Sequence, residues 1–589
     1  MERWFVKNIK ADLNFLSKKL GINKFLCKLM VNRNLKDDKL MDSFINPSLD
    51  KLHNPMLMKD MDLGVKIILD SINKNEKIRI CGDYDQDGNS AILTLYNGLK
   101  KFNANVDYVI PHRIKDGYGI NERIVREAKE DNVDLIITCD NGISAFEAIK
   151  LIKELGIKVI VTDHHDLAYI ENENGIKEYL LPEADAVINP KREDCKYPFK
   201  ELCGAGVAFK LIQAIYSEMN VDMEEAYKLL EFVAMGTVCD VVDLIDENRI
   251  IVKEGLERIN NTDNIGLKAL IEATGLEGKI INTYSLGFII GPCINASGRL
   301  GNAEIAVELF LTEDEEKARK YANRLHSLNE ARKTMTEEGF NKVVKKVENT
   351  DLKKDNVLVV YESSIHESIA GIIAGRVKDR YYRPTIVLTK SKDEYKIKGS
   401  GRSIEEYNMF EEITGVKDLL LAFGGHPMAA GLSLNIDDLH DFRNKLNEQA
   451  SLTESDLIPK VYIDMELPLD YISFPLVESL KVLEPFGKGN PRPLFGAKGL
   501  KVKRAFILGS NQNVLKLIFL TDNGRAMDGI YFGDIEEFER KISEKFGFKE
   551  LNNMYKGIEN KVKLDIVYVP NINEYMGNRK LQVYIQHYR

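Results

Sequence analysis

Cysteine is scarce in this chain, and its seven residues stand singly, without a C-x-x-C pair. We therefore expect neither a structural zinc site nor a disulfide framework, and this usage fits a reducing cytoplasm. A continuous apolar run of about 18 residues is also missing, so no membrane helix is predicted. The first residues mix charged and apolar side chains, a pattern that excludes a secretory signal peptide.

An excess of basic residues is missing as well, because the net charge is −9 at pH 7. Bulk attraction to nucleic acid is therefore weak. A local basic groove is still compatible with this sum, because a cluster of metal-binding carboxylates also lowers it. The hydrophobic content of 44% is ordinary for a globular protein, and 589 residues allow roughly three to four domains.

Short apolar runs alternate with helical patterns between residues 61 and 303. Examples are KIRIC, LIITC and VIVT, and polar residues follow each run at once. Strands that alternate with helices predict βαβ units and a parallel sheet, which places this part in the α/β class. The ligand site of such a sheet lies beyond the carboxyl ends of its strands. The polar residues at these ends are therefore the first candidates for function.

The rest of the chain predicts smaller modules. A charged stretch after residue 303 lacks proline and has little glycine, which predicts a long helical connector. Strands and helices then resume, and after residue 455 short strands at regular spacing predict a small β-barrel or sandwich. The domains that we predict are a helical cap at 1–60, an α/β catalytic domain at 61–303, the connector at 304–352, a smaller α/β domain at 353–452 and a β-rich domain at 455–589.

Three aspartates occupy alternate positions after the strand KIRIC. The carboxylates of Asp83, Asp85 and Asp87 repel one another unless a cation lies among them. An exposed acidic turn is the simple alternative. An EF-hand calcium loop also begins D-x-D-x-D-G, but it follows a helix and needs a glutamate where Thr94 stands. We therefore interpret the three aspartates as candidate metal ligands.

Further candidate ligands follow the next strands. Asp140 follows LIITC, although alone it is more typical of a plain strand exit than of a metal ligand. His164 and His165 follow VIVT between two aspartates, and imidazole together with carboxylate suits manganese, zinc or magnesium. Asp240 lies in an apolar stretch, where an unpaired carboxylate is costly. It completes the candidate set, and Asp243 is the fallback for that position.

The order of the motifs GDYDQDG, CDNG, TDHHD and GTVCDVVDL resembles the DHH phosphoesterase superfamily, named after its aspartate-histidine-histidine motif. The similarity continues through PCINASGRLG, IHESIAGIIAGRV, KGSGRS, AFGGHPMAAG and LEPFGKGNPRPLF, and it covers roughly residues 60 to 589. It looks like the RecJ branch, the bacterial 5′-to-3′ exonucleases of single-stranded DNA that act in recombination and repair. The resemblance implies a DHH catalytic domain, a DHH-associated domain and a C-terminal OB-fold in the segments predicted above.

The resemblance also implies a reaction and its cofactors. Two divalent cations, Mn²⁺ or Mg²⁺, would support hydrolysis of the phosphodiester and release of 5′-mononucleotides. The implied roles are Asp140 as the bridge between the ions, Asp87, His164 and Asp240 as the remaining ligands of one ion, Asp85 as a ligand of the other, and Asp83 and His165 as catalytic residues that are either further ligands or their supports.

Contacts with substrate phosphates are implied on the opposite side of the site. Residues implied for this role are Arg113, Arg299, Ser400, Arg402 and His426, which would hold the 5′ end and thereby set polarity. A glycine turn with a packed histidine is the alternative for the GGHP motif. Two positions depart from the family pattern: Cys293 stands where many relatives carry arginine, and Pro427 replaces a more usual alanine.

An OB-fold implies binding of a single strand through basic and aromatic side chains. Lys501, Lys503, Arg504 and Phe506 form a candidate patch, with solvated lysines on a structural barrel as the alternative. The expected partners are single-stranded DNA, a single-strand-binding protein and a helicase. We expect a cytoplasmic monomer that does not associate with membranes.

Two other functions stay open from the sequence. An oligoribonuclease or cyclic-dinucleotide phosphodiesterase shares the metal and glycine-histidine motifs, but usually lacks the connector and the terminal barrel. A non-catalytic scaffold that binds single-stranded DNA is the other, and the complete set of candidate ligands argues against it. An inorganic pyrophosphatase is the weakest alternative, because it needs neither a barrel nor a strand channel.

Overall fold

The computed structural model describes residues 2–589 except 114, 172–176, 392, 394, 510 and 576. The chain forms two compact units. The first contains Leu52–Val242 and Ile250–Pro459, and the second contains Glu2–Lys51, Asp243–Arg249 and Lys460–Arg589. Among the residues that the structure describes, no helix combines the length and the apolar character that crossing a bilayer requires.

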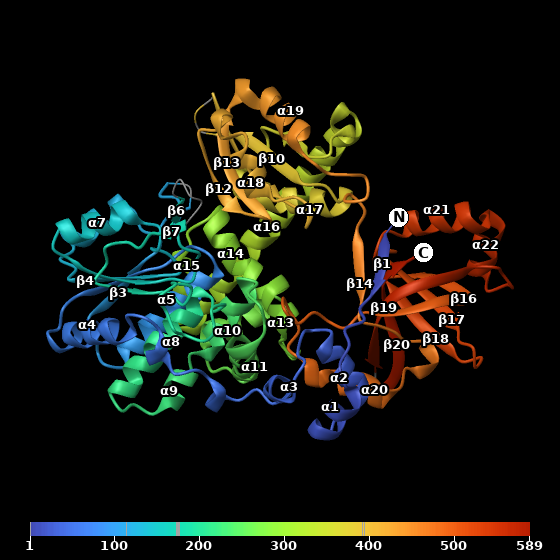
Figure 1. The fold of residues 1–589 in the computed structure, drawn as a ribbon, viewed down its shortest axis with the longest axis horizontal. Coiled ribbons are helices and arrows are strands. Elements are labelled where there is room, and N and C mark those ends of the chain that lie inside the picture. The colour runs from blue at the N-terminus through green and yellow to red at the C-terminus, as the bar shows by residue number, and fades with distance from the viewer. Residues whose placement is uncertain are drawn as a thin grey trace. The chain divides into compact units, whose positions relative to one another are not determined.

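A five-stranded parallel sheet forms the N-terminal part of the first unit (Figure 1). Its strands are buried almost throughout, because helices cover both faces. Figure 1 shows α7 (Phe146–Glu154) over one face, and α4 (Met61–Asn73) and α8 (Gly204–Glu218) over the other. The parallel sheet that the sequence predicts is thereby confirmed. In spatial order the strands are β3 (Val106–Val109), β2 (Ile78–Cys81), β4 (Leu135–Cys139), β5 (Lys158–Thr162) and β8 (Ala186–Ile188).

A set of helices completes this part of the unit. The helix α10 (Leu230–Cys239) packs against α5 (Gln86–Lys100) and α8, and it is apolar on nearly all sides because it is buried on nearly all sides. A π-helical turn, η3 (Leu286–Ile290), continues directly into α14 (Gly291–Leu300). The remaining helices are α6 (Glu122–Glu130), α9 (Met223–Tyr227), α11 (Asp246–Asn260), α12 (Ile265–Ala273), α13 (Thr283–Ser285) and α15 (Glu304–Leu311).

The predicted connector contains one helix of 34 residues, α16 (Glu315–Glu348), which follows α15. Asp314 caps its start by accepting the N–H groups of Glu316 and Lys317. Acidic residues occupy its first turn and Lys345 and Lys346 its last, which suits the helix dipole. Near its end Val343 and Val347 are buried in a core shared with the next domain, so the helix is packed and not a free linker.

The second domain of this unit is a five-stranded mixed sheet with helices, as the sequence predicts. Its order is β12 (Ala422–His426), β13 (Ala429–Asn435), β11 (Lys396–Arg402), β10 (Thr385–Lys390) and β9 (Leu358–Tyr361). Only β9 and β10 are parallel, and the other neighbours are antiparallel. The helices are α17 (Ala370–Tyr381), α18 (Met409–Thr414) and α19 (Leu439–Gln449).

The second unit is built on a closed β-barrel, which confirms the predicted C-terminal fold. The strand β16 (Phe495–Leu508) pairs with β17 (Val514–Leu520) on one side and with β19 (Lys563–Tyr575) on the other. Pairing of β17 with β18 (Ala526–Tyr531), and of β20 (Asn578–Tyr588) with both β18 and β19, closes the ring. Five strands closed in this way are the architecture of an OB-fold. Helices α20 (Phe474–Ser479), α21 (Ile535–Phe546) and α22 (Phe548–Lys556) flank the barrel.

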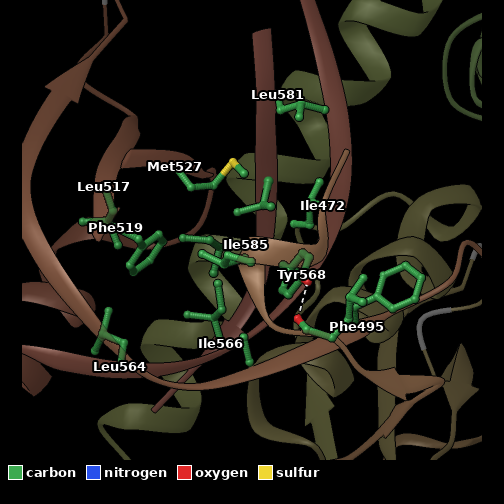
Figure 2. Close-up of a cluster of buried hydrophobic side chains, with 14 of the residues drawn as sticks. Ile472, Phe495, Leu517, Phe519, Met527, Leu564, Ile566, Tyr568, Leu581 and Ile585 are labelled. Carbon is green, nitrogen blue, oxygen red and sulfur yellow. Dashed lines mark hydrogen bonds between the residues drawn. The ribbon is translucent and has the colours of Figure 1, made fainter. Parts of the chain in front are cut away.

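Apolar side chains fill the interior of this barrel (Figure 2). Alternate residues of β17 point inward, so that Leu515, Leu517 and Phe519 are buried while their neighbours are only half-buried. Figure 2 shows Leu517 and Phe519 converging with Ile566 and Ile585 from strands far along the chain. The one buried hydroxyl drawn there, that of Tyr568, donates a hydrogen bond to the backbone oxygen of Leu467 at 2.6 Å.

The N-terminal segment belongs to the same compact unit. Its helices are α1 (Leu13–Leu20), α2 (Lys24–Val31) and α3 (Asp38–Ile45), and Leu29 and Met30 lie in the same buried cluster as the barrel interior. Residues Arg3–Val6 form a strand, β1, which pairs in parallel with β14 (Lys460–Ile463). The helical cap predicted for residues 1–60 thus also contains a strand. The predicted domain boundaries stay predictions.

Candidate active site

The loop after β2 places three carboxylates at the edge of the parallel sheet. Asp85 is the N-cap of α5, and its side chain accepts the N–H groups of Asp87 at 2.9 Å and Gly88 at 3.1 Å. This capping bond is why the helix begins here. Asp83 and Asp87 are buried, at 1% and 2% exposure. Negative charge is favoured at a helix N-terminus, so the start of α5 offsets part of the cost of burying these carboxylates.

Asp87 is held by a second helix as well. Its two carboxylate oxygens accept the backbone N–H groups of Gly204 at 2.6 Å and Ala205 at 3.0 Å, both at the start of α8. The helix α10 approaches the same carboxylate through Gly236. A Cβ atom at that position would lie 2.6 Å from Oδ1 of Asp87, so only glycine allows this approach. Three helices therefore fix one carboxylate.

The next two strand ends bring an aspartate and a histidine to the same place. Asp140 follows β4 with a φ of 60°, a conformation that directs its side chain off the strand axis. The Nε2 atom of His164, after β5, lies 3.0 Å from Oδ1 of Asp140. The same nitrogen lies 3.8 Å from Oδ2 of Asp87 and 3.8 Å from Oδ2 of Asp240, at the end of α10. His164 is thus the centre of three carboxylates.

His165 is oriented by the buried Asp163. Oδ1 of Asp163 lies 2.8 Å from Nδ1 of His165, and its carboxylate also accepts the backbone N–H groups of Ile143 and His164. Burial raises the pKa of Asp163, but the hydrogen bond with His165 and the charge of that ring outweigh it and lower the pKa to about 2. Burial lowers the pKa of His165, yet the same hydrogen bond raises it to about 9.

The pKa of His164 moves the other way. Burial and the neighbouring charge of His165 lower it to about 4, so the imidazole of His164 is neutral at pH 7. A neutral imidazole is the form that binds a metal ion. Tyr118 closes this side of the site, because its hydroxyl donates to the backbone oxygen of Asp140 at 2.5 Å and lies 3.3 Å from Nδ1 of His165.

The carboxylates of the site carry more negative charge than the neighbouring protein groups offset. Burial and the charges of the other aspartates raise the pKa of Asp140 and of Asp83 well above the usual range, and they raise that of Asp240 to about 8. Among the described residues, the buried Oδ1 atom of Asp83 has no hydrogen-bond partner. Divalent cations would relieve both the repulsion and the missing bond.

The donor atoms also suit such ions by type. Two groups hold their ligand atoms within 4.8 Å of one another: Asp140 with His164 and His165, and Asp87 with His164 and Asp240. Oxygen donors with one or two imidazoles match Mn²⁺ and Mg²⁺, and no thiolate belongs to either group. The residues therefore fit divalent cations. Asp83, Asp85 and the fallback Asp243 lie in neither group.

A cavity of 410 Å³ carries several of the predicted phosphate contacts. Arg113 and Ser400 both line it, together with Lys398 and Phe423. The guanidinium of Arg113 stacks over the ring of Tyr84 at 4.7 Å, which holds the arginine beside the aspartate loop. A cavity lined by cationic and hydroxyl groups suits a phosphate.

The other predicted contacts lie near this cavity but do not line it. Arg299 donates to the backbone oxygen of Ser368, a cavity residue, at 2.6 Å. The guanidinium of Arg402 and the hydroxyl of Ser400 both approach Gly371, where a Cβ atom would meet them. His426 is exposed on β12. The structure thus brings Arg113, Ser400 and their neighbours together, with His426 outside the cavity.

Some residues at the site had no separate prediction. Lys398 forms an ion pair with Glu367 in the cavity wall. Asn141 fixes the strand ends, because its Nδ2 donates to the backbone oxygens of Cys81 and Cys139. Both residues could have been found from their positions in the sequence, because Asn141 stands two residues after LIITC and Lys398 belongs to the KGSGRS motif. Cys293, one of the two departures from the family pattern, does not line the cavity, and its buried sulfur accepts a hydrogen bond from Asn329 of α16.

The candidate patch on the barrel is gathered on one strand. Lys501, Lys503 and Arg504 are exposed on β16, and the guanidinium of Arg504 lies 4.5 Å over the ring of Phe506. A bulge between Val502 and Arg504 lets Lys503 and Arg504 both face outward. Basic and aromatic groups therefore meet on the outer surface of the barrel.

Comparison with known proteins agrees with these modules. Family models of the "DHH family, N-terminal domain", the "DHHA1 domain" and the "RecJ OB domain" match residues 77–237, 354–452 and 463–587. The single-stranded-DNA-specific exonuclease RecJ of Bacillus subtilis is 35% identical over 99% of this chain and 70% of its own length. The protein of the same name from Haemophilus influenzae is 32% identical over 95% of each chain.

A solved structure is also similar over the whole chain. The crystal structure of RecJ in complex with Mn²⁺ from Thermus thermophilus has a TM-score of 0.81 and 26% sequence identity, and the match covers 100% of this chain and 79% of that one. The similarity that the motifs indicated is confirmed. This chain belongs to the RecJ family of single-stranded-DNA-specific exonucleases.

Proposed function

We propose that this chain hydrolyses single-stranded DNA from the 5′ end and releases 5′-mononucleotides, with two divalent cations as cofactors. One observation carries the proposal: Asp87, Asp140, His164 and Asp240 converge on one edge of the sheet, in the same unit as a cavity of 410 Å³ lined by Arg113 and Ser400. The names of the relatives, all single-stranded-DNA-specific exonucleases, support the choice of substrate.

The distances around His164 support Asp87, His164 and Asp240 as ligands that would hold one ion. That Asp140 would be shared with a second ion, and that Asp85 would help to hold that ion, rests on the family resemblance. Asp83 contributes the unpartnered oxygen beside Asp85. When bound, Mn²⁺ or Mg²⁺ would offset the charge of the phosphate and lower the pKa of a water molecule, which makes a nucleophile at neutral pH.

The protein groups position the substrate around these ions. Asp163 fixes the imidazole of His165 through Nδ1, so that the ring keeps one orientation beside Asp140. Without a metal ion this contact raises the pKa of His165 to about 9, so the ring would have to lose its proton to join Asp140 and His164 as a ligand. The hydroxyl of Tyr118 lies 3.3 Å from the same Nδ1 atom and 3.4 Å from Nε2.

The 5′-to-3′ direction of digestion would follow from the arginines near the cavity. Arg113, Arg299, Ser400 and Arg402 would grip the terminal 5′ phosphate, and His426 would contact the strand at the exposed rim. A terminal phosphate held at a fixed distance from the metal ligands limits cleavage to the first phosphodiester. The Lys501–Phe506 segment of β16 would hold the strand further along.

The finer expectations belong to this proposal too. Action with a single-strand-binding protein and a helicase, a monomeric state, a cytoplasmic location and a role in recombination and repair stay predictions. An oligoribonuclease or cyclic-dinucleotide phosphodiesterase, and a non-catalytic scaffold, are the alternatives that the experiment below separates.

Digestion of an end-labelled single strand, with and without Mn²⁺, tests the proposal. We expect metal-dependent release of mononucleotides from the 5′ end only, and loss of this activity in Asp140→Asn, which removes the bridging carboxylate. Asp166→Asn is the matched control, because Asp166 is an exposed neighbour of the histidine pair and belongs to neither ligand group. Degradation of di- and trinucleotides alone would support the phosphodiesterase alternative. Strand binding without hydrolysis would support the scaffold.

A further inference from the structure

Two aromatic rings lie open on the surface just before the helix α14. Tyr284 and Phe288 stand one turn apart, and their rings are stacked with centroids 4.9 Å apart and an angle of 21° between planes. Their exposed fractions are 59% and 68%. Residues adjoining them in sequence, Leu286 and Ile290, are buried, so the segment is well packed on one side and leaves the aromatic pair on the other.

This segment packs against Cys239, the residue that precedes the proposed ligand Asp240. The thiol of Cys239 donates to the backbone oxygen of Leu286 at 3.6 Å, and Asp240 is the next residue along α10. Gly291 makes the contact closer still, because a Cβ atom there would collide with the sulfur of Cys239. The beginning of α14 is therefore beside Asp240.

The other end of α14 is beside the predicted phosphate contacts. Asn295 accepts the backbone N–H of Gln86 at 2.7 Å, next to Asp85. Four residues later, Arg299 donates to the oxygen of Ser368 in the wall of the cavity. From Phe288 to Arg299 the helix advances about 16 Å, the reach of a few nucleotides. The ligand set thus lies beside the middle of the helix, between an arginine end and an aromatic end.

We propose that Tyr284 and Phe288 form a stacking platform for bases of the single strand beyond the cleaved phosphodiester. The inference rests on the proposed function, because it takes the 5′ phosphate to lie at the arginine end and the reacting phosphate at the metal ligands. A strand that continues in the same direction passes Asp240 and reaches the aromatic pair. Aromatic faces stack on any base, which suits an enzyme that must accept every sequence.

In this role Tyr284 and Phe288 position the strand and take no part in the hydrolysis. Stacking of one base on an aromatic side chain contributes enough affinity that Phe288→Ala should raise KM on a long strand about tenfold. The kcat value should change little, because Phe288 touches no metal ligand. A dinucleotide ends before the platform, so its hydrolysis should be the same in the variant and the wild type.

Matched variants separate stacking from structure. Phe288→Trp should keep the low KM, because it keeps an aromatic face, whereas Phe288→Leu keeps an apolar side chain and should behave like Phe288→Ala. Since Phe288 is 68% exposed, none of these changes removes a core contact, and thermal unfolding should be unchanged. Tyr284→Ala combined with Phe288→Ala should raise KM further.

A scan of single abasic sites along the strand tests the location. In the wild type, one abasic position a few nucleotides from the 5′ end should raise KM as much as Phe288→Ala does, and the two changes together should add nothing. An abasic effect that adds in full to the variant's effect would overturn the proposal. Equal losses on dinucleotide and long strand would overturn it too, since they would show a local structural role. A KM of Phe288→Ala that equals the wild-type value for strands of every length would also overturn the proposal. The aromatic pair would then be a candidate contact for a protein partner. If the wild type itself digests no single strand with Mn²⁺, the proposed function fails, which is a different result.

Discussion

Replacing Gly236 by alanine should weaken metal binding more than it weakens the fold. The added Cβ atom would lie 2.6 Å from Oδ1 of Asp87, 2.9 Å from Cβ of Ala205 and 3.1 Å from Cβ of Ser90. Overpacking of this kind costs about 1–3 kcal/mol, while alanine gains about 1 kcal/mol over glycine in a helix. The net loss of unfolding free energy should therefore be about 0–2 kcal/mol.

The effect on metal affinity should be larger than the effect on stability. Of the three atoms that the new Cβ would meet, the carboxylate oxygen lies at the end of a side chain and is displaced most easily. Its displacement stretches the hydrogen bonds from Gly204 and Ala205 and moves one oxygen of the Asp87, His164 and Asp240 group. Loss of such positioning typically lowers metal affinity about 10- to 100-fold. Titration of the chelator-treated protein with Mn²⁺, followed by calorimetry and by activity, measures this directly.

A second glycine provides the control. In Gly255→Ala the new Cβ atom would collide with Ala234 and lie 2.5 Å from the backbone oxygen of Leu230. Both of these neighbours are on α10, as Gly236 is, but neither is a proposed metal ligand. It should lower the melting temperature at least as much as Gly236→Ala and leave the affinity for Mn²⁺ unchanged. If Gly236→Ala bound Mn²⁺ with the affinity of the wild type, Asp87 would not be a ligand whose position matters, and the reasoning would be refuted.

Three further predictions concern the neighbouring groups. In the presence of a chelator, the raised pKa of His165 stabilises the fold below pH 6.5, and this stabilisation should be lost as the pH rises toward 9. Asp163→Asn should remove this pH dependence of the melting temperature. A variant whose melting temperature changes with pH as that of the wild type does would contradict the prediction. Arg402→Ala should raise KM for a 5′-phosphorylated strand about tenfold and affect a 5′-hydroxyl strand much less, and equal effects on both would argue against a phosphate contact. Replacing Lys501 and Lys503 by alanine should lower the slope of strand affinity against salt by about 0.7 for each phosphate that these lysines neutralise, with hydrolysis of dinucleotides unchanged; an unaltered slope would leave the lysines merely solvated.

The location of the site could be predicted because strand ends are local features. Asp85 and Asp140 each follow a short apolar run, and parallel pairing then brings the runs to one edge without further information. That a carboxylate flanking the histidine pair orients one of the rings could be predicted from the sequence, but the contact that fixes Asp163 itself could not. Its carboxylate accepts the N–H of Ile143, which comes from the preceding strand's loop, and a contact between two loops leaves no periodic signal in either one.

The N-terminal strand shows the same limit more strongly. Residues Arg3–Val6 are four in number and begin the chain, while their partner is Lys460–Ile463. A run so short carries almost no preference of its own, so its state is decided by the partner strand and not by its sequence. The division of the connector escaped prediction for a related reason: Thr312 and the capping Asp314 separate α15 from α16, although the stretch has helical composition throughout.

The arrangement of charge explains why carboxylates and arginines can share one site without neutralising each other. Asp87 accepts hydrogen bonds from the N–H groups of α8, and Asp85 from those of α5, so neither carboxylate depends on an arginine for its position. The arginines are held by other groups, Arg113 by the ring of Tyr84 and Arg299 by a backbone oxygen. Burial among other cations lowers the pKa of Arg299 to about 10, which still leaves it charged at pH 7. Helix termini thus keep the carboxylates free for metal ions, and aromatic and carbonyl contacts keep the guanidinium groups free for phosphate.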